Sequence, residues 1–423
     1  MAREMKDSGI PWIGDIPESW KIQRYKHIMH KEKSLCEHYN GEDIISLTMN
    51  GVIIRDLDAG GKMPTTFDGY QFVEPEDLLL CLFDIDVTPR CVGLVKNYGL
   101  TSPAYSRFKV HDGYYNAYYD YLLRMIDDRK IFVHLSKNLR SSLTESDFGV
   151  LPTIAPSYDE QKKIAAFLDA ECSCIDSVID QTRASIEEYK KLKQAVITQA
   201  VTKGIRPDRQ MKDSGVDWIG KIPSDWDYTT IGRVSTVVRG GSPRPAGDPR
   251  YFNGSFMPWI TVAEVTNSHG KYITSTATCL TEEGSKRSRV IEENTLLLSN
   301  SGATLGVPKI TLIKGCINDG SVAFYDLLVD MNYLLYVFEG RTLELRKQMQ
   351  GYGQPNLNTT IIKGLYVPLP SKDEQIEIAS YLDSVCIDIE ELILKKEQLL
   401  SSLESHKKSL IYEYVTGKKE VPA

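Results

Sequence analysis

Two segments of this 423-residue chain occur twice, in the same order. Residues 5–20 (MKDSGIPWIGDIPESW) and 211–226 (MKDSGVDWIGKIPSDW) are identical at eleven of sixteen positions, at an offset of 206. Residues 159–169 (DEQKKIAAFLD) and 373–383 (DEQIEIASYLD) match at an offset of 214, and the register continues to the end of the segment without a gap. Self-similarity at a fixed offset is the signature of a duplicated structure. We therefore expect two related halves whose inserts between the repeats differ.

Each copy of the second repeat has the pattern of one long α-helix. Acidic residues follow Pro156 and Pro370, in the first turn, where they favour a helix N-terminus. No proline or glycine interrupts 159–203 or 373–416, and about 45 residues at ~1.5 Å per residue make a helix of roughly 65–70 Å. Apolar residues recur at alternating steps of three and four, which is a heptad stripe. The stripe consists of Ile164, Leu168, Ile175, Val178, Tyr189 and Val196 in the first copy and Ile378, Leu382, Val385, Ile389, Leu392, Leu399, Leu403 and Leu410 in the second.

A helix with one apolar stripe needs a partner, and the second copy is the natural partner for the first. If a pseudo-twofold axis relates the halves, the two helices pair antiparallel, in the manner of a coiled coil. The alternative is two unrelated amphipathic helices, each packed on its own domain. The matching register of the two copies argues against that alternative.

The inserts have the pattern of mixed, mostly β domains. Short apolar or alternating runs bounded by glycine, proline and asparagine predict strands. These runs lie at 43–47, 78–83, 92–95, 295–298 and 307–313. Tyrosine-rich or apolar stretches at 114–125 and 332–349 predict helices, and we expect their aromatic rings in the core rather than against a ligand.

The sequence therefore predicts an α+β fold with two mixed, mostly β domains separated by two long antiparallel helices. The predicted division is a first domain at 1–157, a central helix at 158–204, a second domain at 205–370 and a C-terminal helix at 371–423. The repeated tryptophans, Trp12, Trp20, Trp218 and Trp226, are expected to anchor the chain at the start of each domain.

Composition narrows the class of protein. Hydrophobic residues make up 42% and charged residues 25% of the chain, as in soluble globular proteins. No run of ~18 apolar residues and no N-terminal signal-peptide pattern occurs. The eight cysteines are scattered without the spacing of metal ligands. We expect a cytoplasmic protein with reduced thiols, no metal site and no membrane partner.

The net charge of −7 argues at first against a nucleic-acid partner, but it is unevenly distributed. Residues 1–157 carry −4, 158–203 carry −1, 204–370 carry +2 and 371–423 carry −4. The two helical segments thus supply −5 of the total. DNA binding depends on a local basic face rather than on total charge. We therefore retain DNA as a partner and expect weak affinity for the chain alone.

The duplicated framework resembles the specificity subunit of type I restriction–modification systems. In that family a WIG-x-IP-x-x-W segment, a variable insert, an LP and DEQ pair and a long helix occur twice, as they do here. Three stretches of the second insert also resemble target-recognition motifs: RGGSPRPAGDPRYFNGSFMPWI (239–260), SNSGATLGVPKI (299–310) and QPNLNTTIIKGLYVPLP (354–370). The first insert departs from the pattern, with only looser matches at 102–110 and 138–152.

The resemblance implies a non-catalytic subunit in which each insert is a target-recognition domain for one half of a bipartite, asymmetric DNA site. It implies that two methyltransferase subunits and restriction/translocase subunits join this chain on double-stranded DNA. Any cofactor would belong to those partners, S-adenosylmethionine to the methyltransferase and ATP with Mg²⁺ to the motor subunit. This chain itself is expected to hold none.

Candidate DNA-binding side chains follow from residue chemistry on these motifs. Arginine forks suit phosphate or guanine edges, and asparagine or glutamine amides suit adenine. Solvated loops and ordinary turns are the alternatives for every one of them. The candidates are Arg239, Ser242, Arg244, Arg250, Asn300, Ser301, Thr304, Gln354, Asn356 and Asn358 in the second insert and Arg90, Ser102, Tyr105, Arg140 and Ser141 in the first.

Two other classes of protein compete with this interpretation. A single-chain DNA methyltransferase or nuclease would need an adenine-binding [DN]PP[YF] tetrapeptide, a P-loop or a hydrolase motif, and the sequence has none of these. A coiled-coil scaffold would account for the long helices, but not for two different β-rich inserts between repeated segments.

Overall fold

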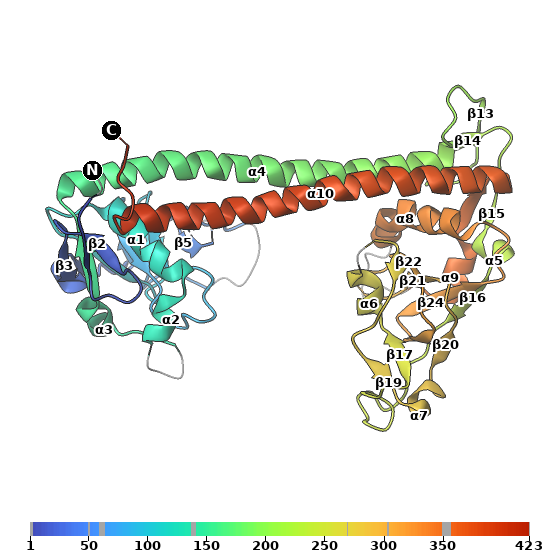
Figure 1. Cartoon of the computed structure of the whole chain (residues 1–423), viewed down its shortest axis with the longest axis horizontal. Coiled ribbons are helices and arrows are strands. Elements are labelled where there is room, and N and C mark those ends of the chain that lie inside the picture. Colours follow the sequence, from blue (N-terminus) through green and yellow to red (C-terminus); the bar gives the residue numbers. More distant parts are fainter. Residues whose placement is uncertain are drawn as a thin grey trace. The chain divides into compact units, whose positions relative to one another are not determined.

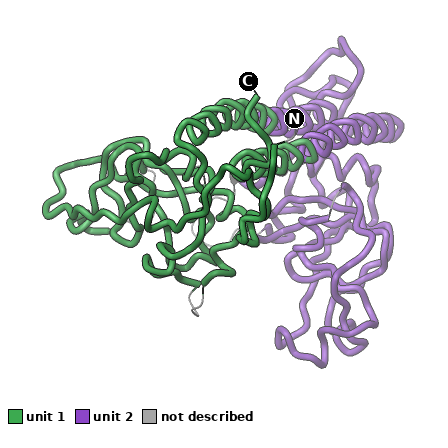
Figure 2. Tube along the Cα trace, turned by 60° about the vertical axis from the view of Figure 1, so that its left-hand side comes forward, with its two compact units in different colours: residues 1–183, 398–423 green, residues 184–397 purple. Residues whose placement is uncertain are grey.

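The computed structural model describes residues 3–49, 51–58, 64–136, 141–268, 270–302, 304–348 and 357–422. The chain divides into two compact units, residues 1–183 with 398–423 and residues 184–397 (Figure 2). Helices α4 (Tyr158–Lys203) and α10 (Lys372–Val415) each contribute to both units (Figure 1). The boundaries between the compact units thus fall inside both long helices. The predicted four-part division instead has its boundaries at the helix ends, and it remains a prediction.

Helices α4 and α10 confirm the two predicted long helices, and they match the uninterrupted stretches 159–203 and 373–416 to within one residue at each end. Helix α10 ends at Val415, eight residues before the predicted bound at 423. Each ends at a glycine with positive φ, Gly204 at +76° and Gly417 at +73°, as a left-handed helix cap requires. None of the helices in the described ranges is long and apolar enough to cross a membrane.

The pairing of the two helices is antiparallel within each unit. In unit 1, Lys407 contacts Asp176 at 2.6 Å and Arg183 contacts Glu404 at 2.9 Å. In unit 2, Lys193 contacts Glu390 at 2.7 Å. Partner numbers fall along α10 as they rise along α4, so the predicted orientation is confirmed.

Most of the predicted heptad stripe is buried or half-buried. Leu168 of α4 and Leu382 of α10 are fully buried, whereas Val178, Leu392 and Leu399 are 39%, 41% and 45% exposed. In α4 the buried residues continue through the middle of the helix at Ile179 and Ile186, each 5% exposed, so the seam passes beside Val178.

The domain of unit 1 is a mixed domain built on small antiparallel sheets. Strands β4, β11, β8 and β9 form a four-stranded sheet, and β1–β2, β3–β12, β5–β6 and β7–β10 form pairs. The elements are β1 (Met5–Asp7), β2 (Asp15–Pro17), β3 (Lys21–Arg24), η1 (Tyr25–His27), β4 (Met29–Lys31), β5 (Ile45–Thr48), β6 (Gly51–Ile54), β7 (Gln71–Val73), β8 (Leu78–Leu80), β9 (Val92–Leu94), β10 (Gly99–Thr101), β11 (Ser106–Val110), α1 (Asn116–Asp128), α2 (Ile131–Leu135), α3 (Glu145–Val150) and β12 (Pro152–Ala155).

The domain of unit 2 has a five-stranded sheet, β16-β24-β21-β22-β18, and a four-stranded sheet, β19-β17-β23-β20. Two strand pairs, β13–β14 and β15–β25, repeat the β1–β2 and β3–β12 pairs of unit 1. The elements are β13 (Met211–Asp213), β14 (Lys221–Pro223), β15 (Asp227–Thr230), α5 (Ile231–Val234), β16 (Thr236–Arg239), β17 (Met257–Ile260), α6 (Val262–Asn267), β18 (Tyr272–Ile273), β19 (Cys279–Leu280), α7 (Glu282–Ser285), β20 (Arg289–Ile291), β21 (Thr295–Ser299), β22 (Pro308–Thr311), β23 (Gly315–Ile317), β24 (Ser321–Tyr325), α8 (Met331–Gln348), α9 (Thr359–Gly364) and β25 (Tyr366–Leu369).

The predicted strands and helices of both inserts are confirmed by β5, β8, β9, β21, β22, α1 and α8. The aromatic residues of α1 line the core as expected, since Tyr118 and Tyr119 are fully buried. In α8, Tyr333 and Phe338 are each 1% exposed.

Two of the four repeated tryptophans, Trp20 and Trp226, join each domain to a long helix through equivalent hydrogen bonds, whereas Trp12 and Trp218 are partly buried and pack against the two cores. The Trp20 indole donates to Glu160 at 2.9 Å in unit 1, and the Trp226 indole donates to Glu374 at the same distance in unit 2. Both tryptophans are 1% exposed, so their predicted anchoring role is confirmed. An arginine, Arg209 in unit 2, contacts the same glutamate and stacks over the tryptophan ring.

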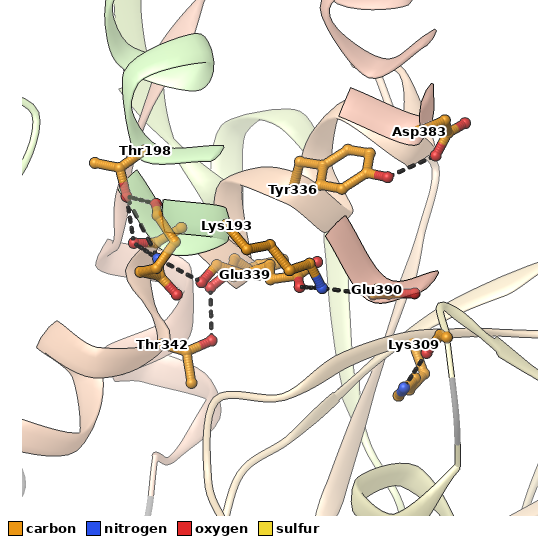
Figure 3. Close-up of polar contacts among 12 residues, drawn as sticks. Lys193, Thr198, Lys309, Tyr336, Glu339, Thr342, Asp383 and Glu390 are labelled. Atoms are coloured by element: carbon orange, nitrogen blue, oxygen red, sulfur yellow. Dashed lines mark hydrogen bonds and ion pairs between the residues drawn. The ribbon is translucent and has the colours of Figure 1, made fainter. Parts of the chain in front are cut away.

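Helix α8 fixes the domain of unit 2 to the helix pair (Figure 3). Lys193 of α4 bridges Glu339 of α8 at 2.8 Å and Glu390 of α10 at 2.7 Å. Tyr336 of α8 donates to Asp383 of α10 at 2.6 Å. Gly340 lets α8 approach α4 closely, because a Cβ there would lie 3.4 Å from the Ile197 side chain.

We predict that Glu374→Ala destabilises unit 2 by roughly 2–4 kcal/mol, because it leaves the buried Trp226 indole N–H without its acceptor and removes one of the two carboxylates that pair with Arg209. Glu377→Ala, one turn along α10, is the matched control, since it removes only the exposed pair with Arg206. The measurement is the urea midpoint of unfolding for the two variants. Equal midpoints would show that the repeated tryptophan–glutamate contact is dispensable.

Candidate nucleic-acid interface

The first two motif stretches of the second insert meet where β23 turns into β24, and the third contacts the second there through Asn300. The Gly240 amide donates to the Ser321 carbonyl at 3.0 Å, and the Gly241 amide donates to the Ile317 carbonyl at 3.0 Å. The Asn300 amide donates to the Gly320 carbonyl at 2.9 Å. Backbone hydrogen bonds therefore hold the first two motifs beside the same turn, although they lie about 60 residues apart in sequence.

Asp319, in the turn after β23, contacts three residues of the arginine-rich segment 239–244. Its carboxylate accepts a hydrogen bond from the Ser242 hydroxyl at 2.6 Å and pairs with Arg244 at 3.3 Å. Its backbone carbonyl accepts from Arg239 Nε at 3.0 Å. The Ser242 hydrogen bond lowers the pKa of Asp319, with smaller contributions from the two arginines.

The predicted candidates Arg239, Ser242 and Arg244 are thus brought together on one loop. The Arg244 side chain is 71% exposed and Arg239 is also exposed, so both guanidinium groups face solvent. Arginine forks on a fixed backbone suit phosphate oxygens or guanine edges. Their contact with DNA remains a prediction.

Gly240 is required by the close approach of the loop to the turn. A Cβ built at Gly240 would overlap the Asn318 carbonyl oxygen, whereas one built at Gly241 meets nothing within 4 Å. The close neighbour of Gly240 is the protein's own backbone.

Asn300 is fully buried and connects the second motif to the third. Its side-chain amide donates to the Leu357 carbonyl at 3.2 Å, and its own carbonyl accepts from the Leu357 amide at 2.7 Å. Among the described residues its Oδ1 atom has no hydrogen-bond partner, and neither do Asn318 Oδ1 and Ser321 Oγ. This geometry gives Asn300 a structural position behind the surface rather than an exposed one.

The remaining candidates of the second insert are in different positions. Asn358 accepts from the Ile361 amide at 2.8 Å and caps the N-terminus of α9, an ordinary role for asparagine. Thr304 is exposed, and Ser301 lies against Gly320. Gln354 and Asn356 lie outside the described residues.

Arg250 belongs to a second basic group on the same domain. It forms a fork with Asp248, with its closest contact at 2.7 Å, and this contact lowers the pKa of Asp248. Arg250 and Arg287 both stack on the ring of Tyr251, at 5.3 and 4.8 Å.

The basic run Lys286-Arg287-Ser288-Arg289 was not among the predicted DNA-binding residues. The Ser288 hydroxyl donates to the Gly241 carbonyl at 2.7 Å, which places this run beside the arginine-rich loop. Lys286, Arg287 and Arg289 are exposed. Three basic residues in four positions were the available signal, but nothing in the sequence indicated that they adjoin Gly241.

In unit 1 the candidates of the first insert do not form one surface. Arg90 pairs with Asp128 at 3.0 Å and is 17% exposed, and burial of Tyr105 raises its pKa. Ser102 accepts from the Ala104 amide at 3.3 Å, and Ser141 has a positive φ of 43°. Arg140 lies outside the described residues. The DNA contacts of this domain remain predictions.

No group of three or more histidine, cysteine, aspartate or glutamate side chains placed to hold a metal ion occurs in the described ranges. The arrangement offers exposed cations and hydrogen-bond donors on a rigid sheet edge. Such a surface can bind a polyanion.

Residues 223–400 match the family model of the type I restriction modification DNA specificity domain. A putative type I restriction enzyme MjaX specificity subunit of Methanocaldococcus jannaschii is 24% identical, over 96% of this chain and 95% of that protein. A chain from a structure of a type I restriction–modification assembly has a TM-score of 0.72 at 15% identity, covering 96% of this chain and 99% of that one. The HsdS subunit of Thermoanaerobacter tengcongensis has a TM-score of 0.50 at 16% identity, covering 96% and 98%.

The second half of the chain thus matches a DNA specificity domain of type I restriction modification systems. Over nearly its whole length the chain is similar to a type I restriction enzyme specificity subunit, and it shares the fold of HsdS subunits.

We predict that Gly240→Ala displaces the arginine-rich loop, because the new methyl group overlaps the Asn318 carbonyl. Gly241→Ala, whose methyl group enters open space, is the matched control. The measurement is hydrogen–deuterium exchange of the loop amides, with faster exchange expected in Gly240→Ala only. Identical protection in the two variants would contradict the close-approach argument.

Proposed function

We propose that this chain acts as a specificity subunit and recognises a bipartite, asymmetric sequence in double-stranded DNA, with each domain binding one half-site. The observation that carries the proposal is one repeated framework holding two unlike domains. The repeated parts place the domains equivalently on the helix pair, so a difference in recognition has to come from the inserts. The exposed arginines of the second domain supply the electrostatic contact that DNA binding needs.

The proposal includes partner subunits on the long helices. In unit 2 several large apolar side chains of α10 are exposed, among them Ile376 at 51%, Ile387 at 56% and Leu394 at 54%. Exposed apolar side chains grouped on one element are typical of a protein interface. We propose two methyltransferase subunits and the restriction/translocase subunits as partners in the cytoplasm. S-adenosylmethionine, ATP and Mg²⁺ would bind to those partners, with no cofactor in this chain.

The test of the proposal is DNA footprinting of the chain assembled with its methyltransferase. Two protected half-sites separated by an unprotected spacer are expected. A scaffold that binds no DNA would give no protection, and a single-chain methyltransferase would transfer methyl groups without a partner. Mapping methylated adenines in a host that carries both subunits would then give the recognised sequence.

Arg244→Ala is expected to change recognition of the second half-site only. If the guanidinium contacts guanine, discrimination at one position falls by about 1–3 kcal/mol. If it contacts phosphate, binding weakens for all sequences and the salt slope falls by about 1. Affinity for duplexes altered in each half-site in turn distinguishes these results. Arg206→Ala, an exposed arginine paired with Glu377 outside the loop, is the control. A loss confined to the first half-site would contradict the domain assignment.

Lengthening both helices is expected to lengthen the spacer between half-sites. The insertion points are after Glu188 in α4 and after Glu397 in α10. They face each other between two ion pairs, Lys193–Glu390 and Arg183–Glu404. Four added residues extend a helix by about 6 Å and rotate it by about 40°. The extension is close to the length of about two base pairs of DNA, at ~3.4 Å each. Methylation mapping should show unchanged half-sites and a longer spacer. An unchanged spacer would contradict the proposal that the two long helices set the distance between the half-sites.

A further inference from the structure

Asp319 has an unusual position for an acid on a DNA-binding surface. It lies among Arg239, Ser242 and Arg244, where a carboxylate opposes a phosphate of the same charge. The other acids near basic residues of this surface have local partners: Asp248 pairs with Arg250, and Glu282 pairs with Lys286 within one helical turn. Asp319 contacts a loop 75 to 80 residues away in sequence.

The two carboxylate oxygens of Asp319 have different partners. One accepts the Ser242 hydroxyl at 2.6 Å, a short hydrogen bond to a side chain that is itself partly buried. The other pairs with Arg244 at 3.3 Å, and that guanidinium is 71% exposed. The first contact fixes the loop to the turn. The second is a weak, solvent-exposed ion pair that a better anion can replace.

A DNA phosphate is such an anion. It offers a guanidinium two parallel hydrogen bonds, whereas Arg244 makes a single long contact with Asp319. Release of Arg244 leaves the Ser242 hydrogen bond, the Arg239 contact with the Asp319 carbonyl and the backbone contacts of Gly240 and Gly241 intact. The lowered pKa of Asp319 keeps the carboxylate ionised at neutral pH.

We propose that Asp319 is a positioning residue of the second recognition domain. It holds the arginine-rich loop through Ser242, and its carboxylate occupies Arg244 until a backbone phosphate of bound DNA displaces it. The inference rests on the proposed function and goes beyond it, because it assigns a role to an acid that does not contact DNA. Its consequence is weaker binding to DNA of any sequence, since the pair between Asp319 and Arg244 has to break when the phosphate binds.

Asp319→Asn separates the two roles. The amide oxygen still accepts from Ser242, but the negative charge is gone. Ser242→Ala does the opposite, because it removes the anchor and keeps the charge. Glu293→Gln is the matched control for charge alone, since Glu293 is an exposed acid of the same domain, beyond the far end of β20 from Arg289.

The experiment measures the affinity of the full chain for a random-sequence 30-base-pair duplex across a salt series. Asp319→Asn should bind more tightly at low salt, with a slope of log affinity against log salt that is steeper by up to about 0.9, because in the wild type the Asp319 carboxylate compensates Arg244 before the phosphate binds. Its advantage over the wild type should then shrink about threefold between 50 and 200 mM salt. Ser242→Ala should keep the wild-type slope, and its loop amides should exchange faster with solvent.

The inference is overturned if Asp319→Asn has the slope and affinity of Glu293→Gln, because the charge would then act only at long range. It is also overturned if Ser242→Ala steepens the slope as much as Asp319→Asn does, because the charge and anchor roles would then be inseparable. Absence of duplex binding by every variant and by the wild type, alone and with the methyltransferase, would overturn the proposed function itself. Normal binding with no response at Asp319 leaves the proposed function standing and removes this inference alone.

Discussion

The hydrogen bond between a first-turn glutamate of each long helix and a buried tryptophan is the contact on which the rest of the framework depends. Glu160 accepts from Trp20, and Glu374 accepts from Trp226. A carboxylate in this position also interacts favourably with the helix N-terminus. Because the tryptophan follows directly on a short strand pair, one interaction fixes the start of the domain and the start of the helix together.

Each of these tryptophans also lies against the end of the other long helix. A Cβ on Gly204 would lie 3.2 Å from the Trp226 ring, and a Cβ on Gly417 would lie 2.8 Å from the Trp20 ring. Tyrosines reinforce these joints: Tyr118 donates to the Val415 carbonyl at 2.8 Å, and Tyr333 donates to the Val201 carbonyl at 3.2 Å. Each unit therefore holds the first turns of one long helix and the last turn of the other. This arrangement explains why the repeated residues concentrate at those two places.

The two domains use this common framework differently. In unit 2 the candidate residues around the turn at 318–321 form one basic surface, with Asp319 behind its arginines. In unit 1 the candidate Arg90 is already paired with Asp128, and Tyr105 packs against the core. The first insert also matches the family motifs more loosely. Its candidate side chains form internal contacts, so they do not give the sequence pattern of an exposed binding loop.

Local and periodic features were predictable from the sequence because they depend on neighbouring residues. Duplication, helix ends, the antiparallel pair and the anchoring tryptophans all follow from repeats, glycine stops and apolar spacing. Val178, Leu392 and Leu399 were placed on the heptad stripe but are partly exposed, because burial depends on what packs beside the helix. Asp319 and the run at 286–289 were missed because their importance comes from contacts with residues far away in sequence. The sequence by itself determined the framework, and only the tertiary structure decided which charged side chains share a surface, since charge contacts follow distance in space.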